Sequence, residues 1–351
     1  GTRTDGQSAY TNTVWLFDTT DPASPALVTQ IQPSDADFAD AFGDAIAISG
    51  SLMLVGAPGD SDNGGLSGSA YLFDTTTGAE LAKIKPASGA ALDEFGFSVD
   101  LDGTTAIIGA RRRDSLTGVA FLFDITDPAS PVELATLAAS DRMQGDMFGF
   151  DVAVEGDTAI VGAIFNDEAG FDAGAAYVYD ISTPAMPVEV AKVLASDANE
   201  TDDFGWTVSL ENGLALITSR TDDDVAPGAG SAYLFDMSDP ASPVELTKIV
   251  PTDSDANDVF GWSAALDGET MLIGAAQDDE AGDTAGAAYV VSVPSEACPA
   301  DTNGDGLVSP ADFNAWILAF NGQLPACDQN GDGLCTPADF NAWILNYNAG
   351  C

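Results

Sequence analysis

Two short segments near the C-terminus carry the oxygen-bearing side chains that a calcium ion needs. Residues 301–312 read DTNGDGLVSPAD and residues 328–339 read DQNGDGLCTPAD, with a glycine at the sixth position of each. Calcium takes about six to eight hard oxygen ligands from a flexible loop with a sharp turn at that glycine. We therefore predict two calcium ions, with these ligands: Asp301, Asn303, Asp305, Leu307 (by its carbonyl oxygen), Ser309 and Asp312 in the first loop, and Asp328, Asn330, Asp332, Leu334, Thr336 and Asp339 in the second.

A helix is expected directly after each loop. Pro310 and Pro337 suit the first turn of a helix, where a missing N–H costs nothing. Apolar residues then recur with helical spacing and form two matching stripes: Phe313, Trp316, Ile317 and Phe320, then Phe340, Trp343, Ile344 and Tyr347. We expect the stripes to form the core of a small module.

The four cysteines, Cys298, Cys327, Cys335 and Cys351, all lie in this same region. An even number of cysteines in a small terminal module indicates disulfides and an oxidising compartment, although three pairings are open. Buried free thiols are the alternative. The module contains no basic residue, so its carboxylates repel one another without a cation. Our hypothesis is that it folds only when calcium binds.

Composition limits what the rest of the chain can do. The 351 residues carry a formal net charge of −46, which argues against nucleic-acid partners and anionic membrane surfaces. The sequence has no histidine, which excludes Ser-His-Asp and Cys-His catalysis and His-ligated metal sites. No apolar run is long enough to span a bilayer.

Internal repeats organise the chain before residue 293. A Phe-Gly pair recurs five times, at Phe42-Gly43, Phe95-Gly96, Phe148-Gly149, Phe204-Gly205 and Phe260-Gly261. A pair of small residues follows each Phe-Gly pair: Gly56-Ala57, Gly109-Ala110, Gly162-Ala163, Thr218-Ser219 and Gly274-Ala275. A third block follows each small pair, in the same order: SAYLFD, VAFLFD, AAYVYD, SAYLFD and AAYVVS. The fourth small pair departs from Gly-Ala. TVWLFD, ending at Asp18, is a sixth copy of the third block alone.

Each unit reads as four short strands. In the second unit they are expected at 95–101, 105–110, 119–124 and 132–137, with a hairpin at Asp102-Gly103 and a proline-fixed turn at 127–131. Four-stranded units at this spacing predict an all-β fold, a multi-bladed β-propeller. It has five complete repeats and a partial N-terminal blade over 13–32, followed by a small α-helical domain. We assign residues 1–294 to the propeller and 296–351 to the C-terminal domain.

Both parts resemble known families. The repeated blocks over about residues 10–292 resemble the FG-GAP repeat of integrin-α-type propellers, which implies a ring of six or seven blades. Closing it would need residues before Gly1 or a blade shared between the ends, and we expect a mature or truncated product. Residues 298–351 resemble a dockerin, a paired EF-hand-type calcium module that binds cohesins, and the Gly-Cys ending is similar to that of planctomycete-type surface anchors. Pro310-Ala311 and Pro337-Ala338 stand where cellulosomal dockerins carry a Ser-Thr-like pair, so the implied partner is a cohesin-like or other surface protein.

The repeats also contain recurring acids. Asp40, Asp93, Asp146, Asp202 and Asp258 lie two residues before each Phe, and Asp35, Asp141, Asp197 and Asp253 lie seven before it, with Ser88-Gly89 in the second repeat. We interpret both sets as caps of turn amides. The alternative is calcium, as in integrin-like blades, but their DxDxDG loop joins the first two strands, where this chain has a tight turn. Asp60-x-Asp62-x-Gly64 resembles that motif in a different loop.

Three functions are compatible with the sequence. The favoured one is a secreted or surface-attached, non-catalytic binding protein, whose propeller takes a carbohydrate or protein ligand and whose C-terminal module anchors it. The second is a polysaccharide-degrading enzyme, since a glycosidase needs only two carboxylates. The third is a structural spacer. For Arg111-Arg112-Arg113 we expect pairing with neighbouring acidic loops, and the alternative is contact with an anionic ligand.

Overall fold

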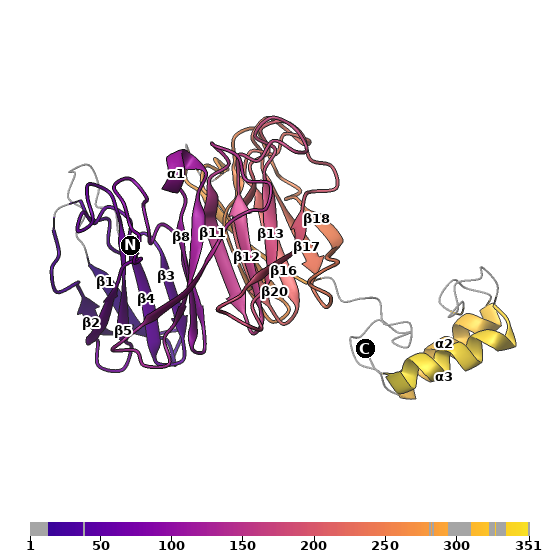
Figure 1. Cartoon of the computed structure of the whole chain (residues 1–351). Coiled ribbons are helices and arrows are strands. Elements are labelled where there is room, and N and C mark those ends of the chain that lie inside the picture. Colours follow the sequence, from indigo (N-terminus) through magenta and orange to yellow (C-terminus); the bar gives the residue numbers. More distant parts are fainter. Residues whose placement is uncertain are drawn as a thin grey trace. The chain divides into compact units, whose positions relative to one another are not determined.

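The computed structural model describes residues 13–37, 39–280, 282, 284–293, 310–322, 327 and 335–349 (Figure 1). The calcium ligands predicted at 301–309, 328, 330, 332 and 334, together with Cys298, Cys351 and the side chains of Asp312 and Tyr347, lie outside the described part. The chain forms two compact units, Gly1–Val291 and Ser292–Cys351.

The first unit contains five successive antiparallel sheets, and each contains or closely follows one Phe-Gly pair. A two-stranded ribbon, β1 (Val14–Asp18) and β2 (Ala26–Ile31), precedes them. The sheets are called blades 1 to 5 in chain order. Blade 1 consists of β3 (Ile46–Ser49), β4 (Leu52–Ala57), β5 (Ser69–Asp74) and β6 (Glu80–Ile84); blade 2 of β7 (Val99–Asp102), β8 (Thr105–Ala110), β9 (Val119–Asp124) and β10 (Val132–Leu137); and blade 3 of β11 (Phe148–Glu155), β12 (Thr158–Ala163), β13 (Ala175–Asp180) and β14 (Val188–Val193). Blade 4 consists of β15 (Phe204–Glu211), β16 (Leu214–Ser219), β17 (Ser231–Asp236) and β18 (Val244–Ile249), and blade 5 of β19 (Phe260–Asp267), β20 (Thr270–Ala275) and β21 (Ala287–Ser292).

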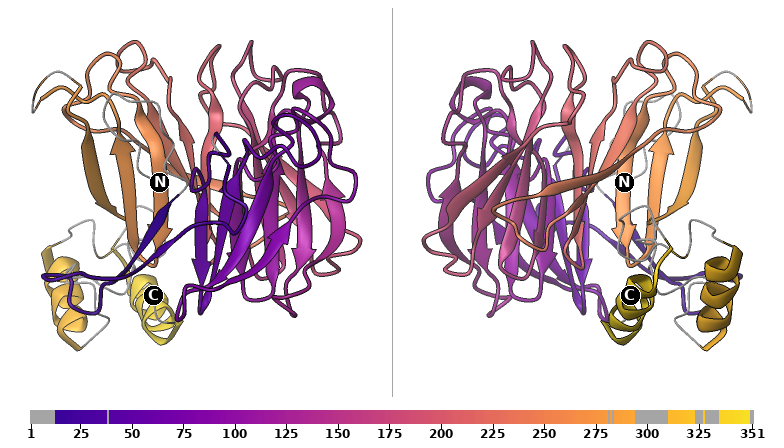
Figure 2. Two further views of the ribbon diagram at one scale, coloured as in Figure 1. Left: turned by 90° about the vertical axis from the view of Figure 1, so that its left-hand side faces the viewer. Right: turned by 90° about the vertical axis from the view of Figure 1, so that its right-hand side faces the viewer.

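The blades stand side by side, as the two views of Figure 2 show. The first strand of each blade contacts the first strand of the next. Together these five strands line a cavity of about 1360 Å³. The expected propeller architecture is confirmed as five blades, although blade 5 has three strands among the described residues.

The Phe-Gly pair joins each blade to its predecessor. Phe95 is fully buried and meets Phe121 of its own third strand edge-on, with ring centroids 5.4 Å apart. Gly96 has a φ of +86°, and a Cβ there would collide with the backbone of Ser69 in the preceding blade. Glycine is needed because two backbones meet. The structural role predicted for this pair is confirmed.

The first strand of blade 2 is shorter than predicted. We expected it over 95–101, but β7 begins at Val99. In the third blade β11 does begin at Phe148, yet its register shifts between Phe148 and Val152. The left-handed glycine after each Phe bends the chain out of the ladder, and regular pairing resumes only beyond this bulge.

The small pair of each blade is in close backbone contact with the Phe-Gly pair of the following blade. A Cβ on Gly109 would collide with the carbonyl oxygen of Gly149 in the following blade. Thr218 replaces this glycine in blade 4, and its Oγ1 donates a hydrogen bond of 2.8 Å to the carbonyl oxygen of Gly261. The departure seen in the sequence is therefore accommodated by an extra hydrogen bond.

One loop of blade 2 contains a helical turn that the sequence did not predict. It is α1 (Arg113–Leu116), whose Asp114 and Ser115 have left-handed backbone angles. No helix in the described part of the chain is long and apolar enough to cross a membrane.

The second unit contains two helices, α2 (Pro310–Gly322) and α3 (Pro337–Ala349). Both begin at the predicted prolines. Trp316 and Trp343 are buried and pack with Phe313, whose ring lies 5.2 Å from that of Trp343. Ile317 and Ile344 are exposed instead, so the predicted core was too wide.

Candidate metal-binding and ligand-binding sites

The acids two residues before each Phe cap turns. Each accepts a hydrogen bond of 2.6–2.8 Å at its Oδ2 from the backbone N–H three residues earlier: Asp37 to Asp40, Ala90 to Asp93, Met143 to Asp146, Asn199 to Asp202 and Asp255 to Asp258. The capping role predicted for this set is confirmed.

The acids seven residues before each Phe do something different. Asp35 accepts a hydrogen bond from the Tyr71 hydroxyl (2.9 Å) and one from Lys83 Nζ (2.7 Å). Asp141 and Asp197 have the same two kinds of partner, a tyrosine on the third strand and a lysine on the fourth. Apart from contacts with their own backbone, these carboxylates bind side chains, so the capping interpretation of this set was wrong.

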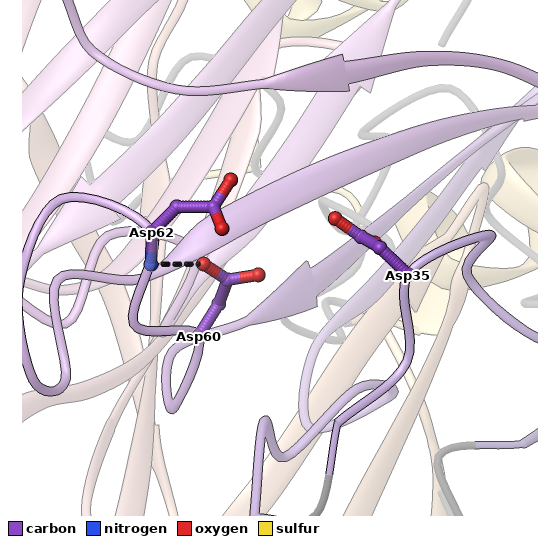
Figure 3. Close-up of side chains that lie close together, drawn as sticks. All are labelled: Asp35, Asp60 and Asp62. Atoms are coloured by element: carbon purple, nitrogen blue, oxygen red, sulfur yellow. Dashed lines mark hydrogen bonds between the residues drawn. The ribbon is translucent and has the colours of Figure 1, made fainter.

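The lysine stands where three carboxylates converge. Figure 3 shows Asp35, Asp60 and Asp62 at the loop end of blade 1. Lys83 Nζ lies 2.7, 2.7 and 2.9 Å from their oxygen atoms. In blade 4, Lys248 Nζ lies 2.7–2.8 Å from Asp197, Asp222 and Asp224. In blade 3, Lys192 contacts Asp141, Asn166 and Glu168.

These two acidic triads have the oxygen spacing of a metal site. However, an ammonium group already supplies the positive charge in each. Partial burial opposes ionisation of Lys83, but hydrogen bonds to Asp35, Asp60 and Asp62 raise its pKa above the usual range. The pKa of Asp62 falls to about 2 because Lys85 and Lys83 both donate to it. The resemblance of Asp60-x-Asp62-x-Gly64 to a calcium loop thus corresponds to a lysine-filled cluster.

Blade 2 fills the same place with an arginine. Ser88 and Phe121 replace the aspartate and the tyrosine, and Arg113 reaches in from the neighbouring loop. Its guanidinium donates to Ser88 O (3.1 Å) and Asp93 Oδ2 (3.0 Å). It also lies over the Phe121 ring.

The other two arginines of this run are paired as well. Glu94 accepts from Arg111 Nε at 2.9 Å and from a terminal nitrogen of Arg112 at 2.8 Å. The expected pairing with acidic loops is confirmed. Blade 4 repeats the arrangement with Arg220 Nε and Asp203, 3.0 Å apart.

Four aromatic rings and two arginines form a stack at one end of the central cavity. The rings of Phe97, Phe150, Trp206 and Trp262 come from four successive blades, each two residues after the Phe of a Phe-Gly pair, with neighbouring centroids 4.5–5.4 Å apart. Arg111 lies 3.4 Å from the Phe97 centroid and Arg220 lies 3.6 Å from that of Trp206. This cation–π stacking links neighbouring blades at that end of the cavity.

Carboxylates line the wall of the same cavity. Asp151 accepts a hydrogen bond from Val208 N–H (2.9 Å) and Asp100 one from Val154 N–H (2.7 Å), so each links two neighbouring blades. Burial raises the pKa of Asp151 to about 7 and that of Asp100 to about 6. These acids were absent from our predictions because their partners lie in the next repeat.

Of the predicted C-terminal ligands, Thr336 and Asp339 are described with their side chains. Asp339 is fully buried and accepts hydrogen bonds from Thr336 N–H (2.6 Å) and Thr336 Oγ1 (3.2 Å). Thr336 Oγ1 in turn accepts a hydrogen bond from Ala338 N–H (3.2 Å) and so caps the start of α3. A disulfide joins Cys327 to Cys335, on either side of residues 328–334. The predicted presence of a disulfide is confirmed for this pair.

Comparison with known proteins identifies the repeat. A family model described as the FG-GAP repeat matches five segments, residues 26–73, 79–123, 131–179, 187–235 and 243–291. The chain belongs to the FG-GAP repeat family. Each matched segment runs from the fourth strand of one blade through the third strand of the next, so the FG-GAP unit spans a blade boundary. None of the curated proteins searched matches this chain.

Proposed function

We propose that this FG-GAP protein is a non-catalytic binding protein of the cell exterior. Its propeller would present loops to a carbohydrate or protein ligand, and its C-terminal, dockerin-like module would hold two calcium ions and attach it to a cohesin-like or other surface partner. The observation that carries the proposal is the five-fold FG-GAP match over consecutive blades. FG-GAP propellers are typically binding folds rather than catalytic ones.

The loop end of the blades has the surface that such a role needs. Several large apolar side chains are exposed there: Leu66, Leu92, Met143, Phe171 and Val225. They lie on the loops that enter the third or the first strand, beside the lysine-filled clusters. Exposed apolar groups among charged ones are typical of protein and carbohydrate contact surfaces.

Calcium in the C-terminal module is supported by charge. The Asp339 carboxylate is fully buried. The sequence holds no lysine or arginine after Lys248. A buried carboxylate is stabilised by hydrogen bonds and by a nearby positive charge, which a calcium ion would supply. The oxygen-rich loops 301–312 and 328–339 would supply the remaining ligands. The disulfide between Cys327 and Cys335 is consistent with an extracellular location.

The test is a binding and activity screen of the full chain against one panel of polysaccharides and surface proteins, with calcium and with a chelator. We expect saturable binding without release of sugar products, and calcium-dependent binding of a surface partner. The matched control is Asp301→Ala with Asp328→Ala, which should lose only the calcium-dependent partner. Release of sugar would support an enzyme, and an absence of any binding would support a spacer.

A further inference from the structure

The lysine-filled cluster of blade 3 differs from its two counterparts at one buried position. Asn166 stands there in the repeat, where blade 1 has Asp60 and blade 4 has Asp222. All three residues are nearly fully buried, at 5%, 4% and 3% exposed. The lysine of blade 3 therefore meets a neutral amide in place of a carboxylate. The carbon of an amide can be attacked by an amine, whereas the charge of a carboxylate repels such an attack.

Lys192 holds its amine against that amide. Its Nζ atom lies 2.9 Å from Asn166 Oδ1, the oxygen bonded to the amide carbon Cγ. The Lys192 side chain is only 15% exposed. The Tyr177 hydroxyl accepts a hydrogen bond of 3.2 Å from Asn166 Nδ2, so both ends of the amide are held. Reacting groups fixed in this way reach effective molarities of about 10⁵ M or more.

Three acids surround the pair and can move its protons. Glu168 and Asp141 accept hydrogen bonds from Lys192 Nζ at 2.6 and 2.7 Å. Asp146 hydrogen-bonds the side chain of Asn166, and its burial raises its pKa despite this hydrogen bond. Asp146 therefore holds a proton more readily than an exposed aspartate does, and it can pass that proton to the amide nitrogen.

We propose that Lys192 and Asn166 become joined by an isopeptide bond, an amide between two side chains. Lys192 gives one proton to Glu168 or Asp141, and its free Nζ attacks Cγ of Asn166. The Nζ–Cγ bond forms, the Cγ–Nδ2 bond breaks, and Nδ2 leaves as ammonia with a proton from Asp146, which recovers one from Nζ. The ammonia then takes up the proton first given away. One ammonium ion thus replaces the charge of the lysine, and no oxidant is consumed.

The charge of the lysine slows this step but does not prevent it. Partial burial opposes ionisation, but hydrogen bonds to Asp141 and Glu168 raise the pKa of Lys192. A small neutral fraction is sufficient, because the bond forms once in each molecule and the ammonia diffuses away. The two acids can lose their lysine because their side chains are 44% and 55% exposed and are therefore solvated by water.

The bond fixes the outer edge of blade 3. It connects the loop ahead of β13 to β14, and it is independent of any ligand of the propeller. All four cysteines lie in the C-terminal unit, so the propeller cannot form a disulfide within itself. A covalent closure of this kind limits the conformations of the unfolded chain, as a disulfide does. The ion pairs of Lys192 belong to the chain before this step.

Mass spectrometry tests the bond directly. The full chain is kept folded at neutral pH, and its mass is followed over several days after unfolding and reduction of the disulfides. We expect the chain to become lighter than its sequence mass by one ammonia. Digestion after glutamates should then yield residues 156–168 and 190–200 as one branched fragment.

Three variants probe the reacting groups. Asn166→Asp, which recreates the clusters of blades 1 and 4, and Lys192→Arg should both keep the full mass. Lys248→Arg is the matched control and should still lose ammonia and give the branched fragment. Asp146→Asn keeps the turn cap through its amide oxygen but cannot pass on a proton. We expect it to form the bond about a hundred-fold more slowly.

A folded wild-type chain that keeps its full mass would overturn the proposal. A loss of ammonia without the branched fragment would do the same, since Asn166 would then have reacted with its own backbone. Equal yields of the branched fragment in urea would show that the folded cluster does not promote the reaction. Equal rates in the wild type and Asp146→Asn would overturn the role given to that acid.

Discussion

Lys83, Lys192 and Lys248 each form ion pairs with the acids that meet at the loop end of one blade. Lys248 is the only cation within 4 Å of Asp197, Asp222 and Asp224 in the described part of the chain. Of these acids, Asp222 is almost fully buried. A lysine in this place does what a bound cation would do, and it connects the outer strand to two loops.

The first prediction concerns this lysine. Lys248→Met keeps most of the packing but leaves three converging carboxylates without their charge partner, so we expect a loss of about 2 kcal/mol in the free energy of unfolding. Urea denaturation measures it. The matched control is Lys85→Met, because Lys85 pairs with the exposed Asp62 alone and should cost roughly 0.5 kcal/mol or less. Equal losses would show that the cluster adds no stability.

The second prediction concerns Asp202, which caps a turn and is buried beside other acids. Burial, together with the charges of Asp222, Asp223 and Asp224, raises its pKa to about 7. The folded protein therefore holds this proton more tightly than the unfolded chain does. Its contribution to stability is full below about pH 4 and is lost as the pH rises through about 7.

Asp202→Asn should remove that dependence while its amide oxygen still accepts from Asn199 N–H. We expect the variant to be more stable than the wild type at pH 8, on the order of 2 kcal/mol, and nearly equal to it at pH 4. Urea denaturation across this pH range provides the measurement. A wild type that is more stable than Asp202→Asn at pH 8 would contradict the raised pKa.

At the scale of elements, the blades are held together by backbone contact at the Phe-Gly pairs. Side chains such as Asp100 and Asp151 also link neighbouring first strands. Glycine at Gly96 allows the carbonyl of Ser69 to approach. The strands of two blades are thus fixed relative to one another by a residue with no side chain.

The third prediction separates this contact from backbone strain. Gly96→Ala should cost several kcal/mol, since its methyl group would meet the Ser69 backbone. Gly103→Ala has a φ of +54° but nothing within 4 Å, so it should lose only about 1 kcal/mol from the left-handed backbone. Both are measured by urea denaturation, and similar losses would refute a special role for close approach.

Local sequence predicts the elements better than the clusters. Alternation and turn residues identified β8, β9 and β10 at their observed bounds, because those signals lie within a few neighbouring residues. The lysine clusters were missed because Asp35, Tyr71 and Lys83 meet only after the blade folds. A usable signal was present: each tyrosine follows its aspartate by 36 residues in blades 1, 3, 4 and 5.

The fourth strands offer a second example. Glu80 accepts hydrogen bonds from the backbone and side chain of Ser34 in the preceding loop, and Glu189 and Glu245 do the same with Ser140 and Ser196. The glutamate stands near the start of each fourth strand, where the sequence predicted only an alternating strand. Its partner lies in another repeat, so periodicity within one strand does not reveal it.

In the whole molecule, every lysine and arginine lies in the propeller unit and none in the C-terminal module. The acidic blade clusters carry their own lysines and arginines, whereas the C-terminal module has none. With a net charge of −46, the chain attracts cations everywhere, but ordered calcium is expected only where oxygen ligands lack an internal countercharge.

A calorimetric calcium titration of the full chain at about 0.15 M salt, where diffuse charge attraction is screened, tests this division most directly. We predict two bound ions and a gain of helical circular dichroism, both lost in the double variant Asp301→Ala with Asp328→Ala, which leaves the propeller untouched. Calcium sites that persist in the double variant would place the ions in the acidic blade loops and contradict the account, as would a wild-type chain that binds no calcium.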